Sequence, residues 1–248
     1  MKRSGQAEST GTPHLEVRHV PGGLELRVDG TLASYTRHGG KITGPVWWAL
    51  AAPVLLLPPG RRRILLLGLG AGSVARAIRT LSPRAKIVGV ERDDEILSLA
   101  RKHFGLDDLD LEVVCGDALE YLRRNRRTFD LIIDDVFVGT ARSVRKPEWL
   151  LGEGYDLVRR RLRSGGLLVC NTIHETREVV GALKAFPGRI LSLDVRGHWN
   201  RVVVCGRDLV PARDVRATLA ATPALAAVIG ELSVRSHRSG TALASRRA

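Results

Sequence analysis

The sequence is poor in cysteine, and no cysteine is placed for a disulfide or a metal site. Cys115, Cys170 and Cys205 are the only three in 248 residues, and they lie far apart in apolar, strand-like runs. No C-x-x-C pair occurs. We therefore expect small buried side chains in a reducing compartment, with no bound metal.

Long apolar runs are also missing. The longest, residues 46–57, is interrupted by Pro53 and is too short to cross a bilayer. The first eight residues lack the apolar core of a signal peptide. The sequence therefore predicts a cytoplasmic location and no membrane partner.

Aromatic residues make up only 4% of the chain, although its formal net charge is +13 at pH 7. A platform for stacking bases is therefore poorly supplied. The short basic runs at 61–63, 123–127 and 159–163 fall at expected ends of elements, where solvated charge is common. We do not expect a nucleic-acid partner, although the charge alone leaves RNA binding open as an alternative.

What the chain has is a regular alternation of strand-like and helix-like segments. Alternating apolar residues predict a small N-terminal β-hairpin region at 14–58. Residues 59–232 predict an α/β catalytic domain with a doubly wound, mainly parallel seven-stranded sheet whose last strand is antiparallel. The polar ends, residues 1–13 and the basic tail 233–248, are predicted to be disordered.

The most informative segment is a G-x-G-x-G turn formed by Gly68, Gly70 and Gly72, between an apolar run and a helix start. Glycines let the backbone approach a ligand, and amides at a helix start face it. Glu91 follows 23 residues after Gly68, where a carboxylate can accept hydrogen bonds from ribose hydroxyls. A dinucleotide fingerprint would have Gly or Ala where the chain has Ser73, so an adenosylmethionine-type ligand is favoured over NAD.

Polar residues also follow the next three strands. Gly116 and Asp117 follow the third, and Asp117 can accept a hydrogen bond from an adenine amino group. Asp134 and Asp135 end the fourth, and the segment 171–174 ends the fifth. Ligands of such sheets lie beyond the carboxyl ends of the strands, so these residues predict one site. Taken singly, each carboxylate can equally be a helix cap.

The chain resembles the spermidine synthase-like family over roughly residues 15–206. The resemblance rests on five segments and is moderately specific, because many class I methyltransferases share the glycine and acidic motifs. The segments are Leu-Leu-Leu-Gly-Leu-Gly-Ala-Gly-Ser at 65–73, Val-Gly-Val-Glu-Arg-Asp at 88–93, Ala-Arg-Lys-His-Phe-Gly at 100–105, Val-Cys-Gly-Asp-Ala at 114–118 and Phe-Asp-Leu-Ile-Ile-Asp-Asp at 129–135.

The resemblance implies a Rossmann-like methyltransferase fold, with Glu91 at the ribose, Asp117 at the adenine and Asp135 as the catalytic aspartate. It also implies that the N-terminal hairpin offers an edge for a homodimer. Three positions depart from the aminopropyltransferase pattern. Ala71 and Val138 stand where that pattern has aspartates, and its Tyr-His pair is replaced around residues 42–44.

These losses remove carboxylates that would bind the ammonium groups of polyamines and of decarboxylated adenosylmethionine. The sequence therefore favours adenosylmethionine itself as co-substrate and methyl transfer to a small-molecule acceptor, with Asp135 as base. A polyamine aminopropyltransferase acting on an amine is the main alternative. A non-catalytic ligand- or RNA-binding protein and an NAD-dependent oxidoreductase are further alternatives.

Four other side chains are weaker candidates for the site. His174 and Tyr155 are second-rank catalytic candidates, and a lone histidine after a strand is more often a surface residue. Trp47 and Trp48 can wall the acceptor pocket, but packing against the sheet is the simpler interpretation. For Asp134, a capping or solvent-exposed role is expected, because alternation turns it away from Asp135.

Overall fold

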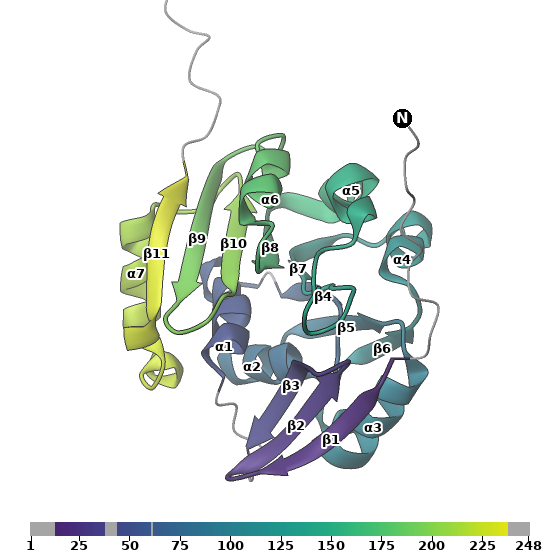
Figure 1. Cartoon of the computed structure of the whole chain (residues 1–248). Coiled ribbons are helices and arrows are strands. Elements are labelled where there is room, and N and C mark those ends of the chain that lie inside the picture. The colour runs from purple at the N-terminus through teal and green to yellow at the C-terminus, as the bar shows by residue number, and fades with distance from the viewer. Residues whose placement is uncertain (1–12, 38–43, 61, 238–248) are drawn as a thin grey trace, which may run out of the picture.

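The computed structural model describes residues 13–37, 44–60 and 62–237. Its centre is a mixed eight-stranded sheet with helices on both faces, and a separate three-stranded sheet precedes it (Figure 1). The strand order of the large sheet is β11-β9-β10-β8-β7-β4-β5-β6. This arrangement confirms the predicted Rossmann-like methyltransferase fold, with one strand more than the seven expected.

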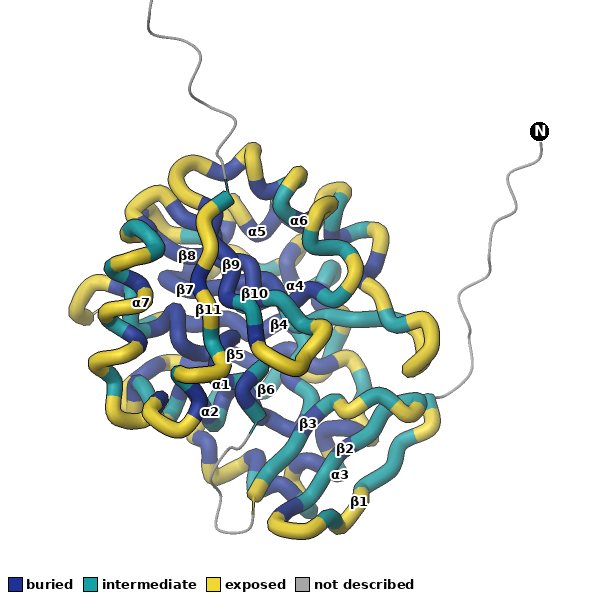
Figure 2. Tube along the Cα trace, turned by 60° about the vertical axis from the view of Figure 1, so that its left-hand side comes forward, coloured by how far each residue is buried: buried dark blue, intermediate teal, exposed yellow. Residues whose placement is uncertain are grey.

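The parallel part of the large sheet follows the predicted alternation of strands and helices. It consists of β4 (Arg63–Leu67), β5 (Lys86–Glu91), β6 (Glu112–Cys115), β7 (Phe129–Asp134) and β8 (Leu162–Thr172). The strand β7 is buried along its whole length, which explains its mostly apolar sequence (Figure 2). All five strands run in one direction, so their carboxyl ends meet at one edge of the sheet.

Three antiparallel strands complete the sheet: β9 (Arg189–Val195), β10 (Arg201–Gly206) and β11 (Leu232–His237). The pairing of β9 with β10 is as predicted. The strand β11 is unexpected, because the sequence predicts a disordered tail from Ser233. That prediction is wrong for Ser233–His237, where one side chain, Val234, is buried and its neighbours are exposed. So short an alternation is a weak sequence signal.

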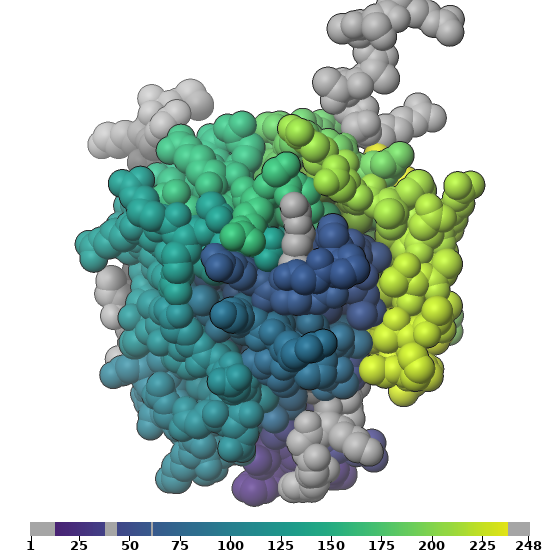
Figure 3. Space-filling view, turned by 180° about the vertical axis from the view of Figure 1, so that it is seen from behind, coloured from purple at the N-terminus to yellow at the C-terminus, as the bar shows by residue number. Residues whose placement is uncertain are grey.

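The helices form two layers. Helices α1 (Pro45–Ala51), α2 (Ser73–Leu81), α3 (Asp94–Phe104) and α7 (Ala212–Ala220) share one apolar core, whereas α4 (Ala118–Arg124), α5 (Tyr155–Arg161) and α6 (Thr176–Leu183) share the other. From behind, the blue segments around α1 and α2 lie beside the yellow C-terminal ones (Figure 3). Among the described residues, none of the helices has the length and apolarity that a membrane span requires.

Alternation along the strands supplies both cores from one sheet. On β4, Ile64 and Leu66 face the first helix layer, and Leu65 and Leu67 face the second. This alternation continues to the strand ends, so adjacent residues there also point to opposite faces. The two faces therefore present different chemistry at the same edge.

The N-terminal region is a three-stranded antiparallel sheet of β1 (Leu15–Val20), β2 (Gly23–Val28) and β3 (Thr31–Arg37). The sequence predicts only a hairpin here. Asp29 and Gly30 both have positive φ, +48° and +80°, and turn the chain from β2 into β3. The predicted helix at 45–57 is α1 followed by the 3-10 segment η1 (Ala52–Leu56). Most of the residues predicted to be disordered, 1–12 and 238–248, lie outside the described ranges.

Candidate functional site

The glycine turn lies at the carboxyl edge, directly after β4. Gly68, Gly70 and Gly72 have φ of +81°, +53° and +84°, a region that strongly favours glycine. At Gly68 a side chain is excluded for a second reason, because a Cβ there would lie 2.6 Å from the carbonyl oxygen of Asp135. The turn is thus packed against the chain that leaves β7.

Three successive amides of this turn are already engaged inside the protein. Gly70 donates to Oε2 of Glu91 at 2.9 Å, and Gly72 donates to the carbonyl of Leu69 at 3.0 Å. Ala71 donates to the hydroxyl of Ser34, on β3, at 2.9 Å. The N-terminal sheet therefore holds the turn directly. These three amides are therefore not free to donate to the carboxylate of adenosylmethionine.

Glu91 ends β5, and its carboxylate is buried beside the turn. Oε1 accepts the amides of Arg92 at 2.9 Å and Asp93 at 3.3 Å, while Oε2 accepts that of Gly70. Burial raises the pKa of Glu91, and these amides oppose the rise. An ionised carboxylate has about four acceptor positions, so one remains for a ribose hydroxyl.

Gly116 and Asp117 follow β6 beside Glu91, to whose carbonyl the amide of Gly116 donates at 2.8 Å. Asp117 is exposed, and its Oδ1 caps α4 by accepting the amide of Glu120 at 3.0 Å. Its second oxygen remains available for an amino group. The helix-cap role and the predicted adenine contact are therefore compatible.

Asp134, at the end of β7, forms a closed ionic cluster on the side of α5. Its carboxylate lies 2.8 Å from the ammonium of Lys146, and both side chains are 0% exposed. The hydroxyl of Tyr155 donates to it at 3.1 Å, and so does the amide of Val136. The predicted capping or solvent-exposed role is therefore wrong. Alternation does turn Asp134 away from Asp135, but into a core rather than into water.

Asp135 follows on the other face and is only half-buried. The amide nitrogen of Asn171 donates to its Oδ1 at 2.7 Å, and Asn200 in turn donates to Asn171 at 3.0 Å. Burial raises the pKa of Asp135 to about 6, against the opposing effects of Asn171 and Lys146. Its Oδ2 is left for another donor, and a carboxylate with this pKa is a suitable base near neutral pH.

Among the described residues, no hydrogen bond joins a weaker candidate to the carboxylate of Asp135. Trp48 is buried in the core and Trp47 packs against it, as the simpler interpretation has it. His174 is exposed. Tyr155 is buried and donates to Asp134, where burial raises its pKa well above the usual value. Val138 pairs with Arg145 through two backbone hydrogen bonds of 2.9 Å.

Sequence reasoning missed three side chains that shape the site: Ser34, Lys146 and Asn200. Each acts through a contact over 12 or more positions, with Ala71, Asp134 and Asn171 respectively. No local pattern marks such pairs. The cysteines are free, with Cys170 and Cys205 buried and Cys115 exposed, contrary to the expectation that all three are buried. No metal-ligating group of side chains occurs among the described residues.

Comparisons with known proteins find likenesses of sequence and of fold. A methyltransferase domain family matches residues 64–166. A probable polyamine aminopropyl transferase of Bifidobacterium longum is 32% identical over 163 residues, which is 62% of this chain but only 35% of that protein. The chain thus spans about a third of this curated relative's length.

Two solved structures extend the likeness to most of the fold. A probable spermidine synthase from Corynebacterium glutamicum superposes with a TM-score of 0.69 at 18% identity, covering 94% of this chain and 91% of that one. This chain has a spermidine synthase-like fold. Human methyltransferase-like protein 13, solved with SAH, gives a TM-score of 0.64 at 20% identity, covering 81% and 98%. At 18% and 20% identity, both likenesses concern the fold.

Proposed function

We propose that this chain is a transferase that moves a 3-aminopropyl group from decarboxylated adenosylmethionine to a small amine. The observation that carries the proposal is the engagement of the amides of Gly70, Ala71 and Gly72 by Glu91, Ser34 and Leu69. None of these amides is left to bind the carboxylate of adenosylmethionine. The decarboxylated donor has no carboxylate and does not need them. The name of the Bifidobacterium relative points the same way.

The residues at the edge fit an adenosine group. Glu91 keeps an acceptor position for ribose, Asp117 keeps one for adenine, and a Cβ placed on Gly116 would meet no atom within 4 Å. The donor supplies a carbon activated by its sulfonium. The protein must then orient the acceptor and remove its proton.

Asp135 would do this second task. With a pKa of about 6 it is mostly ionised at pH 7.5. Asn171 holds Oδ1 and leaves Oδ2 for the acceptor amine. The amine nitrogen bonds to the donor carbon, the carbon–sulfur bond breaks, the thioether leaves as methylthioadenosine, and the proton passes to Asp135.

A second candidate is methyl transfer from adenosylmethionine, which the sequence favours. The observation behind it is Ala71, which is 3% exposed and supplies no carboxylate to balance the ammonium of the decarboxylated donor, whereas adenosylmethionine carries its own carboxylate beside its ammonium. The two functions release different products. Methyl transfer leaves adenosylhomocysteine, and aminopropyl transfer leaves methylthioadenosine.

The test is to incubate the protein with each donor and a panel of diamines, and to identify the nucleoside product by mass spectrometry. We expect methylthioadenosine from the decarboxylated donor, and its loss in the Asp135→Asn variant. Adenosylhomocysteine from adenosylmethionine, with no methylthioadenosine from the other donor, would replace the proposal with methyl transfer. Binding of both donors without any product would contradict both functions.

A further inference from the structure

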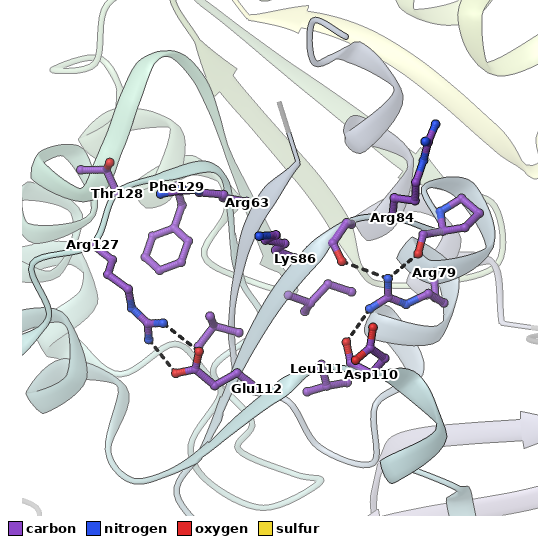
Figure 4. Close-up of a pocket in the computed structure, with 14 residues that line it drawn as sticks. Arg63, Arg79, Arg84, Lys86, Asp110, Leu111, Glu112, Arg127, Thr128 and Phe129 are labelled. Carbon is purple, nitrogen blue, oxygen red and sulfur yellow. Dashed lines mark hydrogen bonds and ion pairs between the residues drawn. The ribbon is translucent and has the colours of Figure 1, made fainter. Parts of the chain in front are cut away.

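A hollow of about 890 Å³ lies at the edge of the same sheet opposite the candidate site (Figure 4). It is lined at the amino ends of three parallel strands by Arg63 of β4, Lys86 of β5 and Phe129 of β7. The carboxyl ends of these strands carry the glycine turn, Glu91 and Asp135. The hollow is therefore a separate place in the fold, and the proposed transferase chemistry does not use it.

The lining of this hollow is predominantly cationic. It has five basic side chains against two carboxylates, a surplus of three positive charges: Arg63, Arg79, Arg84, Lys86 and Arg127 against Asp110 and Glu112. The positive charge is gathered from three separate stretches of the chain, which is why no single basic run in the sequence reveals it.

Two of the basic side chains build the walls. Arg127 and Glu112 form a bidentate pair at 2.7 and 2.8 Å, and both are drawn at one side of Figure 4. On the other side, Arg79 donates to the carbonyls of Asp110 at 2.7 Å, Ala85 at 2.9 Å and Leu109 at 2.9 Å. Carbonyl groups do not neutralise a guanidinium, so Arg79 keeps its charge at a fixed position.

The other three basic residues are exposed and belong to the lining of the hollow, with Arg84 at its rim. Arg63, Arg84 and Lys86 have no carboxylate within ion-pair distance in the described parts of the chain. A carbonyl-anchored arginine and three unpaired cations around one hollow form a site for negative charge.

We infer that this hollow binds a compact oligophosphate, meaning an anion with two or more linked phosphate groups. Its volume is in the range of small-molecule sites rather than of an extended nucleic-acid groove. The aromatic ring in its lining, Phe129, is only 3% exposed and cannot stack on a base. The surplus charge therefore recognises phosphates, and any nucleoside attached to them makes few contacts.

The test is isothermal titration of the whole chain with inorganic triphosphate, ATP and a 20-nucleotide single-stranded RNA at about 150 mM salt. We expect triphosphate and ATP to bind with similar affinity. The variant Arg84→Ala/Lys86→Ala should weaken both by roughly tenfold or more, because two charge-assisted hydrogen bonds are lost. The double variant should retain transferase activity, which shows that it folds.

The matched control is Arg160→Ala/Arg177→Ala, which removes the same charge from exposed positions on α5 and α6. It should change the affinity less than about twofold. Equal weakening by both double variants would reduce the effect to net charge and overturn the inference. Absence of binding of triphosphate and ATP at millimolar concentration would also overturn the inference. So would a result in which the double variant weakens the binding of RNA but not that of triphosphate or ATP.

Discussion

Asp134 and Asp135 are neighbours in sequence, yet their surroundings are opposite. Asp134 is fully buried against Lys146 and Tyr155, so every contact of its carboxylate is internal. Asp135 is half-buried, held at one oxygen by Asn171, and has a pKa raised to about 6. The first belongs to a structural ion pair, and the second is the carboxylate that we propose as the base.

The difference follows from strand geometry, because successive side chains of an extended chain point to opposite faces. On one face of the sheet, α5 and the segment that carries Lys146 close over the end of β7. On the other face, the glycine turn packs against the backbone of Asp135, and the residue stays half-buried. Two adjacent aspartates therefore have different roles.

The largest expected effect comes from breaking the Asp134 side. The substitution Asp134→Ala leaves the ammonium of Lys146 buried without its counter-charge, which costs about 3–5 kcal/mol of the free energy of unfolding. Urea denaturation followed by circular dichroism measures the change. Replacing the cluster by apolar side chains, in Asp134→Leu/Lys146→Met/Tyr155→Phe, should recover most of the loss. A stability within about 1 kcal/mol of wild type for Asp134→Ala would show that the pair is not structural.

The substitution Asp135→Asn should have the opposite profile. Asparagine keeps an oxygen that accepts the amide of Asn171 but removes the base, so kcat should fall by about 10²–10⁴-fold. The exposed Asp156→Asn is the matched control and should retain activity. Full activity of Asp135→Asn would sink the assignment of this residue as base.

The same variant should not lose stability. Because the pKa of Asp135 is raised in the folded state, its ionisation disfavours folding. The contribution of this group to stability is therefore greatest below about pH 4 and is lost as pH rises through about 6. Asp135→Asn removes this dependence and should be more stable than wild type at pH 8, by about 1–3 kcal/mol. Parallel melting curves at pH 4 and pH 8 measure it. A lower melting temperature than wild type at pH 8 would contradict the destabilising effect assigned to the ionised form of this carboxylate.

A smaller effect is expected from Asn171→Ala. The hydrogen bond from Asn171 lowers the pKa of Asp135, so its removal should move the rise of kcat/KM with pH upward from about 6. A pH–rate profile separates this from a general loss of structure, which would lower the rate at every pH without moving the midpoint. An unchanged midpoint would show that Asn171 does not set the pKa of Asp135 in the reaction.

Much of this arrangement is readable in the sequence, and the reason is local. The glycine turn, Glu91, Asp117 and Asp135 sit at strand ends that the apolar runs mark clearly, and the structure brings all of them to one edge. The side chains that bond to these residues or to their neighbours cannot be found from the sequence. Ser34, Lys146 and Asn200 reach the site through tertiary contacts, and short alternations such as β11 give too few buried side chains to stand out.

The smallest expected effect distinguishes the two carboxylates most cleanly. Tyr155 donates to Asp134 and lies on the structural side, although its sequence position after β7 makes it a catalytic candidate. The substitution Tyr155→Phe removes one hydroxyl from a buried network and should cost about 1 kcal/mol of the free energy of unfolding. It should leave kcat and the pH midpoint of the reaction unchanged, because the hydroxyl of Tyr155 bonds to Asp134 and no hydrogen bond links Asp134 or Lys146 to the carboxylate of Asp135. Steady-state kinetics on the variant, beside its denaturation curve, provide the measurement. A fall in kcat of more than about tenfold, with the small stability loss intact, would mean that the cluster around Asp134 takes part in the reaction and that the two sides are not separate.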